Sequence, residues 1–244
     1  MGCQSWARVR SSCIIAAMLQ RLTRRLTAAP LNTSRIRLEE FAADAASVGK
    51  DRSFRVLDAG AGSTPYRQLF DHVSYEACDI EDNGLQDYVC DVADLPMDDA
   101  TYDLVFCSQT LEHVPNPFKV MGELERVLKP GGQLWMSAPF IYEEHVKPHD
   151  FFRYTRFAWR RMARRVGLEV ESLEVLEGYY GTLSYHLHTG YRTLPRRMML
   201  TRAVLMFLAR RLARQEMREK LERPGLCKNY RVVMTKPLVR SSTA

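Results

Sequence analysis

Short apolar runs alternate along this chain of 244 residues with segments in which apolar residues recur every three or four positions. The apolar runs predict strands at residues 54–58, 73–78, 87–90, 102–107 and 133–138. The helical periodicity predicts helices at residues 34–48, 64–70, 116–128 and 157–166. Because strands and helices alternate at short and even spacing, the pattern predicts an α/β fold built on a doubly wound parallel sheet.

Capping and turn residues mark the ends of the predicted helices. Ser34 is the predicted N-cap of the first helix, since its hydroxyl can accept a hydrogen bond from an amide of the first turn. Pro117 suits the first turn of helix 116–128, and the segment Lys129-Pro130-Gly131-Gly132 is expected to end that helix. The next strand is therefore expected to begin only at residue 133.

The alternation changes in the last third of the chain. Residues 168–176 and 230–235 are the sixth and seventh predicted strands, and the segment between them is far longer than one helix. We therefore predict a helical insertion at about 178–226, in which residues 198–212 have the pattern of a basic amphipathic helix. Such a helix can lie on a membrane surface and admit a lipid-linked molecule, cover a site, form a dimer contact or pack on its own domain.

Charge is distributed unevenly along the chain. Residues 1–38 hold seven arginines and no acid, residues 39–150 hold 8 basic and 22 acidic residues, and residues 151–244 hold 20 basic and 7 acidic residues. Two basic ends therefore flank an acidic body, for a formal net charge of +6. Basic ends favour an anionic partner surface, either membrane headgroups or nucleic acid, and a solvated helix face is the alternative.

The first 33 residues are set apart by composition. We predict that residues 1–33 are a basic extension, poorly ordered or an amphipathic helix, and that residues 34–244 form one domain. The apolar run 14–19 is too short to span a bilayer. An organelle transit peptide, a surface helix and an over-long start before Met18 all fit this composition. We expect a cytoplasmic location, with peripheral membrane association and organelle targeting left open.

The six cysteines contain no Cys-x-x-Cys pair. Three of them, Cys78, Cys90 and Cys107, belong to predicted strands, where a free thiol acts as a small apolar side chain. The pattern indicates a reducing compartment, with neither a disulfide framework nor a zinc site.

A glycine turn follows the first predicted strand, in the segment Val56-Leu57-Asp58-Ala59-Gly60-Ala61-Gly62. Gly60 and Gly62 lack a Cβ atom, so the backbone can turn sharply and approach a ligand closely. Tight turning alone also accounts for many such glycine pairs. Asp79 ends the second predicted strand about twenty residues later, where an acid can accept both ribose hydroxyls of an adenosine; a surface turn is the alternative.

Further motifs follow in order. They are Asp91-Val92-Ala93-Asp94-Leu95-Pro96, Tyr102-Asp103-Leu104-Val105, Leu111-Glu112-His113-Val114 and Leu128-Lys129-Pro130-Gly131-Gly132. With the glycine turn and Asp79, this series resembles the class I S-adenosylmethionine-dependent methyltransferases, in their type 11-like small-molecule and glycan-associated subgroup. The resemblance covers about residues 54–140. It implies a Rossmann-like sheet of seven strands, mostly parallel with the last strand antiparallel, and S-adenosyl-L-methionine as the cofactor.

The resemblance also implies which residues bind the methionine end of that cofactor. The turn at Gly60 and Gly62 would hold the amino-acid end, and Asp58 would attract its ammonium group. Ser108 and Gln109, at the tip of the fourth predicted strand, would face the methionine end and the reacting centre. All five lie at the carboxyl ends of predicted strands, where open α/β sheets bind ligands.

The resemblance assigns the adenosine end of the cofactor to residues that follow the next two predicted strands. Asp79 would accept the ribose hydroxyls, and Ile80 would offer an apolar face to the adenine ring. The resemblance implies that Asp91 bonds the adenine amino group and that the backbone amide of Val92 meets the ring. A dinucleotide-binding oxidoreductase, the nearest competing enzyme, needs a third glycine where this chain has Pro65.

A loop rich in histidine, acid and aromatic residues follows the fifth predicted strand. The segment from His145 to Thr155 resembles a loop found in a subgroup of these methyltransferases that is associated with glycan and other secondary-metabolite substrates. His145 or His149 is a candidate to take a proton from an acceptor hydroxyl, Asp150 to orient that histidine, and Arg153 to bind an acidic group or pair with Asp150. Bracing of the next helix is the alternative for Asp150 and Arg153. No metal is expected, because the sequence offers His145 and His149 no evident third ligand.

The sequence therefore predicts an enzyme that transfers a methyl group to a small-molecule, glycan or lipid-linked acceptor, on oxygen. The alternative from another class is a catalytically silent, membrane-associated binding module with the same fold. Nucleic acid is not the expected substrate, because the chain lacks the Asn/Asp-Pro-Pro-Tyr/Phe type of site for a flipped base.

Overall fold

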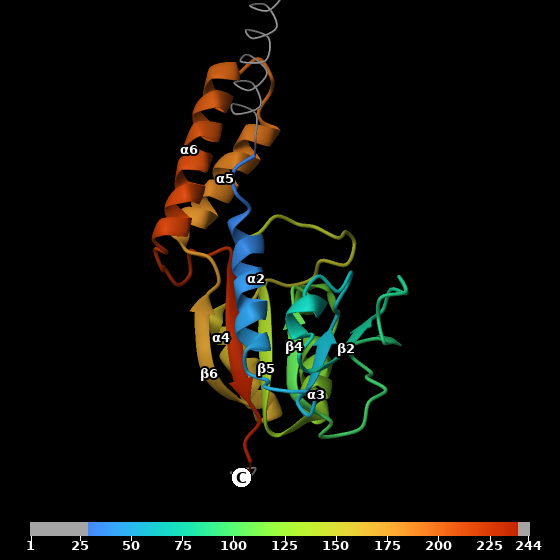
Figure 1. Cartoon of the computed structure of the whole chain (residues 1–244). Coiled ribbons are helices and arrows are strands. Elements are labelled where there is room, and N and C mark those ends of the chain that lie inside the picture. The colour runs from blue at the N-terminus through green and yellow to red at the C-terminus, as the bar shows by residue number, and fades with distance from the viewer. Residues whose placement is uncertain (1–28, 239–244) are drawn as a thin grey trace, which may run out of the picture.

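A sheet of seven strands forms the centre of the protein (Figure 1). The computed structural model describes residues 29–238, so most of the predicted N-terminal extension lies outside the described residues. The strand order is β3-β2-β1-β4-β5-β7-β6. The strands are β1 (Arg55–Ala59), β2 (Ser74–Asp79), β3 (Tyr88–Val89), β4 (Tyr102–Ser108), β5 (Leu128–Pro139), β6 (Glu169–Val175) and β7 (Asn229–Thr235).

Only β7 runs against its neighbours in this sheet. The pairs β1–β2, β1–β4, β2–β3 and β4–β5 are parallel, whereas β7 pairs antiparallel with both β5 and β6. The order reverses between β1 and β4, so the chain leaves a crevice at the carboxyl ends of these two strands. The predicted fold class, a doubly wound seven-stranded sheet with an antiparallel last strand, is confirmed.

Helices cover both faces of the sheet. They are α2 (Thr33–Ala46), α3 (Pro117–Val127), α4 (Arg156–Val166), α5 (Tyr179–Thr193) and α6 (Met199–Arg218), with short 3₁₀ turns η1 (Arg67–Phe70) and η2 (Leu111–His113). One buried cluster contains the inward residues of α3 and α4, and a second contains those of α2. Strand β4 serves both, since Val105 faces the first cluster and Phe106 the second. A strand covered on both faces needs the continuous apolar sequence that β4 has.

The predicted cap of the first helix is wrong by two residues. Asn32 is the N-cap of α2, and its side chain accepts a hydrogen bond from the Arg35 amide. Ser34 instead donates from its hydroxyl to the buried carboxylate of Glu177. Long-range burial of this serine, which the local sequence does not reveal, therefore decides its role.

Two further boundaries differ from the prediction. Only the turn η1 forms within the predicted helix 64–70, because Thr64 has a φ of 50° and precedes Pro65, which disfavours the helical conformation before it. Strand β5 begins at Leu128, directly after α3, and a register shift against β4 takes up the extra residues before Gln133. The glycine-rich segment that was expected to separate helix from strand is thus part of the strand.

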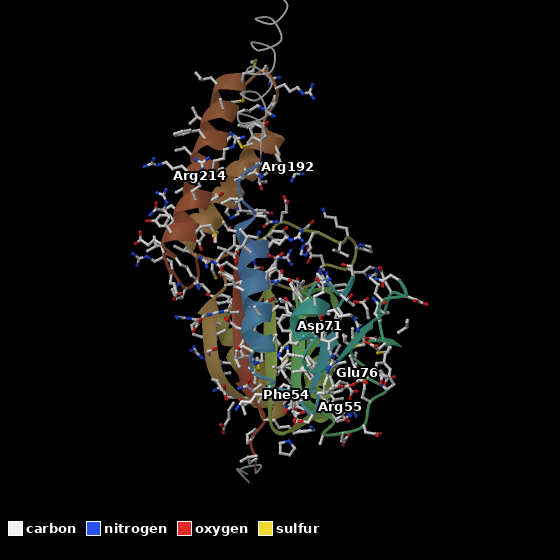
Figure 2. The ribbon with its side chains drawn as sticks, viewed as in Figure 1. Phe54, Arg55, Asp71, Glu76, Arg192 and Arg214 are labelled. Carbon is white, nitrogen blue, oxygen red and sulfur yellow. The ribbon has the colours of Figure 1, made fainter. Side chains whose placement is uncertain are left out.

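The predicted insertion between β6 and β7 contains two helices, α5 and α6, which form a hairpin that extends beyond the sheet (Figure 1). Arg192 and Arg214 lie on this hairpin, at the other end of the molecule from Phe54 and Arg55 (Figure 2). The carboxylate of Glu216, fully buried on α6, accepts hydrogen bonds from two amides at the start of α5, and thereby holds the two helices together. None of the described helices is long and apolar enough to cross a bilayer.

Candidate active site

A cavity of about 270 Å³ lies at the carboxyl ends of β1 and β4. Its walls are formed by Asp58, Gly60, Ala61, Gly62, Ser63, Pro65, Tyr66, Ser108 and Gln109. Five of these are predicted cofactor-binding residues, drawn from two strands that are distant in sequence. The crossing between β1 and β4 therefore brings together the residues assigned to the methionine end of the cofactor.

The two glycines of the turn have different surroundings. Gly60 has a φ of +75°, and a Cβ atom placed on it would lie 2.3 Å from the side-chain methyl of Thr110. Gly62 has a φ of +52°, and a Cβ atom placed there would meet no atom within 4 Å. Gly60 is therefore required for close packing against the loop after β4, whereas Gly62 leaves open space beside the cavity.

Asp58 places a buried carboxyl group in the cavity wall. It accepts a hydrogen bond of 2.6 Å from the Tyr75 hydroxyl on β2. Burial raises the pKa of Asp58 to about 7, against the opposing effect of that hydrogen bond. A cation bound in the cavity would favour its ionised form.

Asp79 and Ile80 lie beyond the cavity, at the end of β2. Asp79 accepts a hydrogen bond of 2.8 Å from the Gly62 amide and another, of 3.0 Å, from the Glu81 amide. Ile80 is 69% exposed. Asn83, on the following loop, donates from its side chain to the Gly62 carbonyl. The loop after β2 is thus tied to the glycine turn by contacts that the sequence did not predict.

Asp91 and Val92 follow β3, outside the residues that line the cavity. The Asp91 carboxylate accepts a hydrogen bond of 2.8 Å from the Ala93 amide, which closes a local turn. Val92 is buried in the core. Their predicted contact with adenine stays a prediction.

Ser108 and Gln109 meet Ser137 of β5 at the tip of β4. The two serine hydroxyls are 2.8 Å apart, and the Gln109 side chain donates to the Ser137 hydroxyl over 3.1 Å. Gln109 has a φ of 56°, a conformation that non-glycine residues adopt at a cost. The network holds this backbone against the cavity.

The loop after β5 is organised around one ion pair. Asp150 receives both terminal nitrogens of Arg153, at 2.6 and 2.7 Å, and the His145 amide at 2.8 Å. These contacts, the arginine first, hold the pKa of Asp150 well below its usual range. Arg153 also donates to the carbonyls of Phe152 and Glu143, so most of its donors serve the loop itself.

The predicted catalytic histidines have separate environments within this loop. The Nδ1 atom of His145 lies 3.4 Å from Asp150, and burial lowers the pKa of His145. His149 is exposed, and its backbone carbonyl lies 2.7 Å from Nδ1 of His113. Only His145 is therefore positioned against the acid that was predicted to orient a histidine.

Comparison with known proteins bears on the segment that lines the cavity. Residues 57–136 match the family model described as a methyltransferase domain. This match, the relatives and the fold support a class I S-adenosylmethionine-dependent methyltransferase domain in this chain.

Two curated relatives and one solved structure show the extent of this likeness. The 27-O-demethylrifamycin SV methyltransferase of Amycolatopsis mediterranei is 38% identical, over 43% of this chain and 52% of that protein. The ubiquinone biosynthesis O-methyltransferase of Thiobacillus denitrificans is 33% identical, over 30% of this chain and 38% of that protein. The chain thus spans about half or less of these relatives.

The solved structure is similar in fold. A sarcosine dimethylglycine methyltransferase from Galdieria sulphuraria, described as putative, has a TM-score of 0.55 at 18% identity, over 83% of this chain and 86% of that one. An identity of 18% shows similarity of fold alone. This similarity of fold covers 83% of the chain, and so reaches beyond the residues that match the family model.

Several residues near the loop after β5 escaped the sequence prediction. Lys228, buried before β7, places its ammonium group 4.6 Å from the ring centre of Tyr142 and 4.3 Å from that of Tyr185. Burial lowers the pKa of this lysine, and the two tyrosine rings stack 5.1 Å apart. The contact joins the loop after β5 to helix α5, so the hairpin borders that loop.

Glu112, in turn η2, is a second group whose position sequence did not reveal. Its side chain is fully buried, and burial raises its pKa to about 8. Among the described residues its nearest polar neighbours include His113 and His145. The motif Leu111-Glu112-His113-Val114 was noted as a family signature, but the loop after β5 brings His145 to it only through the fold.

Proposed function

We propose that this chain transfers a methyl group from S-adenosylmethionine to a hydroxyl oxygen of a small-molecule acceptor. The observation that carries the proposal is the cavity at the β1–β4 crossing, which gathers Asp58, Gly60, Gly62, Ser108 and Gln109. The names of the curated relatives, which include an O-methyltransferase, support transfer to oxygen.

The cavity fits the methionine end of this cofactor on two observations. A buried carboxyl group at Asp58 would neutralise the ligand's ammonium, and the open space at Gly62 would let the ligand approach the backbone. Gly60 keeps the turn tight, while Ser108 and Gln109 would face the reacting centre.

The adenosine end would extend along the carboxyl ends of β2 and β3. Each Asp79 oxygen already accepts one amide, and each keeps a lone pair for a ribose hydroxyl. Ile80, which is exposed, would pack on adenine. Asp91 and Val92 would contact the edge of the ring.

When bound, S-adenosylmethionine supplies a methyl group on a sulfonium that is already reactive. The protein has to align the acceptor and exclude water, and alignment alone can contribute much of the rate. The loop after β5 would hold the acceptor, with its shape fixed by the Asp150–Arg153 pair. His145 or His149 would receive the proton that the hydroxyl loses.

Titration calorimetry with S-adenosylhomocysteine, the product of the donor, tests the cofactor site. We expect the purified full chain to bind this compound and the Asp79→Ala variant to bind it about 10- to 100-fold more weakly, since hydrogen bonds to a charged group contribute about 1.5–3 kcal/mol. The matched control is Asp71→Ala, an exposed acid outside the cavity. Absence of binding, or equal affinity in all three proteins, would refute the proposal.

We further propose that α6 contacts a membrane surface and that the acceptor is lipid-linked. Apolar side chains stand exposed along this helix, with Met199 76%, Leu200 80% and Phe207 64% accessible. Arginines share the hairpin, among them Arg192 and Arg214 (Figure 2). Exposed apolar residues beside arginines favour the interface of an anionic bilayer.

Co-sedimentation with vesicles tests this contact. We expect the chain to pellet with vesicles containing phosphatidylglycerol and less with phosphatidylcholine alone. A double variant, Leu200→Ser with Phe207→Ser, should remain in the supernatant, while the control Leu69→Ser, an exposed residue of η1, should pellet as before. Equal pelleting of the double variant would exclude this surface.

A further inference from the structure

Three side chains from two segments of the chain face one another at the proposed acceptor loop. The Nε2 atoms of His113 and His145 lie 3.7 and 4.0 Å from the Oε1 atom of Glu112. One candidate ligand atom from each residue lies within 4.8 Å of the other two. Turn η2 supplies Glu112 and His113, and the loop after β5 supplies His145.

Within the described part of the chain, the side chain of Glu112 is buried without the polar partners that a buried carboxylate needs. The residue has no exposed surface, and neither of its oxygens has a hydrogen-bond partner among the described residues. A buried carboxylate without partners is costly, because it has left water and gained nothing in exchange. A cation held between its oxygens and the two imidazoles would supply the missing interaction.

The tautomers of both histidines suit such a cation. The Nδ1 atom of His113 lies 2.7 Å from the His149 carbonyl, which can only accept, so Nδ1 carries the hydrogen and Nε2 offers a lone pair. The Nδ1 atom of His145 lies 3.3 Å from the Glu143 carbonyl and 3.4 Å from Asp150, with the same consequence. Both lone pairs then meet on the Glu112 side.

These outer contacts are of the kind that orient metal-binding histidines. A ligating imidazole usually donates its other N–H to a carboxylate or a backbone carbonyl, which fixes the tautomer and the ring direction. His113 has the carbonyl, and His145 has both a carbonyl and the Asp150 carboxylate. Asp150 is in turn held by Arg153, so the support extends one layer further.

We propose that Glu112, His113 and His145 bind a divalent transition-metal cation. Two imidazoles and one carboxylate form a donor set suited to Zn²⁺, Mn²⁺ or Fe²⁺ rather than Ca²⁺. Two bonds of about 2 Å from one ion span ligand atoms at most about 4 Å apart, and about 3.3 Å apart at tetrahedral angles. The 3.7 and 4.0 Å separations here would therefore shorten by about half an ångström when an ion binds. The sequence analysis considered His149 beside His145. In the structure His113 takes that place, and His149 contributes only its backbone carbonyl, which contacts Nδ1 of His113.

The consequence for catalysis rests on the proposed function. The side chains of His113 and His145 are 21% and 27% exposed, so one side of the cluster is open to an acceptor. A hydroxyl oxygen bound there would have a lowered pKa and would lose its proton more readily, to water or to His149. His145 would then act as a ligand and not as the base.

Metal binding can be measured without any methyl transfer. The full chain is treated with a chelator and titrated with Zn²⁺, Mn²⁺ and Mg²⁺ by calorimetry, and the Co²⁺ form is examined by visible absorption. We expect the chain to bind one equivalent of Zn²⁺ or Mn²⁺ and to bind Mg²⁺ more weakly. The Co²⁺ form should show the visible absorption bands of a site with a low coordination number.

The variants are Glu112→Gln and His145→Gln, each expected to weaken binding at least 100-fold. His145→Gln changes a loop residue and leaves the buried core intact, so its result stands even where Glu112→Gln lowers stability. The matched control is His149→Ala, which removes an imidazole and keeps the backbone carbonyl; its affinity should be unchanged.

Two results would overturn the proposal: no binding of any of these cations at millimolar concentration, or equal binding by the control and both variants. S-adenosylhomocysteine titration of the same samples separates the two proposals. If the chain binds the metal but not S-adenosylhomocysteine, the cation site stands and the methyltransferase function is refuted. If it binds S-adenosylhomocysteine but no metal, only the cation site is refuted.

Discussion

Asp58, in the wall of the cavity at the β1–β4 crossing, makes a pH-dependent contribution to stability. Its carboxyl group is buried and accepts the Tyr75 hydroxyl, and burial raises its pKa from about 3.8 to about 7. The substitution Asp58→Asn keeps the shape and an oxygen that can accept the same hydroxyl, but removes the titrating proton. The variant therefore isolates the cost of ionising this one group.

The sign and size follow from linkage. The native state binds the proton more tightly than the unfolded chain, so the wild-type protein loses stability as pH rises from about 4 through about 7. A difference of about three pKa units corresponds to about 4 kcal/mol once the group is fully ionised. Asp58→Asn avoids that loss. Its stability relative to wild type should rise by about this amount between pH 4 and pH 8.

Urea unfolding at pH 4.5, 6, 7 and 8 measures the effect. The control is Asp71→Asn, an exposed acid whose stability difference from wild type should be nearly constant with pH. A pH-independent difference between Asp58→Asn and wild type would show that Asp58 is ionised at all these values, and the reasoning from burial would be wrong.

Ligand binding gives a second measurement of the same group. An ammonium group bound beside Asp58 favours the ionised carboxylate, so binding of S-adenosylhomocysteine, which carries that group at its amino-acid end, should release about half a proton near pH 7. Calorimetry in buffers of different ionisation enthalpy reports that number. Asp58→Asn should release none, and equal release by both proteins would place the proton elsewhere.

Three further predictions follow from packing and charge. Gly60→Ala should cost about 3 kcal/mol in urea unfolding, from overpacking and positive φ together, and Gly62→Ala only about 1 kcal/mol, from its φ alone; equal costs would contradict the distinction. Glu216→Ala should cost about 3 kcal/mol and speed proteolytic cleavage of the α5–α6 hairpin, because two buried amides lose their acceptor; unchanged cleavage would show that this contact does not hold the hairpin. The low pKa of Asp150 adds stability above pH 4 that is lost as pH falls. Arg153→Lys lacks the paired contact with Asp150, so this variant should lose less stability than wild type between pH 6 and pH 3. Parallel acid-unfolding curves for the variant and wild type would exclude this assignment.

The sequence is most informative where structure is local. The strands β1, β4 and β7 were predicted to within one or two residues, because buried strands need apolar runs, and Gly60 marks the end of β1. The alternation of strand and helix predicted a doubly wound parallel sheet, and the structure supplies the strand order. The cavity residues from Asp58 to Gly62 are neighbours in sequence, so their grouping required only the turn itself.

Prediction fails where a residue is defined by a distant partner. Ser34 has the right chemistry for a helix cap, yet it bonds Glu177, which is 143 positions away. Glu112 resembles an ordinary surface acid until the fold buries it. The approach of His145 depends on the path of the loop after β5, and that path is fixed by an ion pair with no periodic signature.

The two halves of the site therefore differ in how they are specified. The proposed donor half is built from short segments at strand ends, so any chain with this sheet and turn can form it. The proposed acceptor half combines η2, the loop after β5 and helix α5, which meet through Glu112, His145 and the contact of Lys228 with Tyr142 and Tyr185. Changes in loop length or in the hairpin alter this half without disturbing the sheet. The acceptor should accordingly differ among proteins that share this fold, since the residues that would contact it lie outside the elements that define the fold.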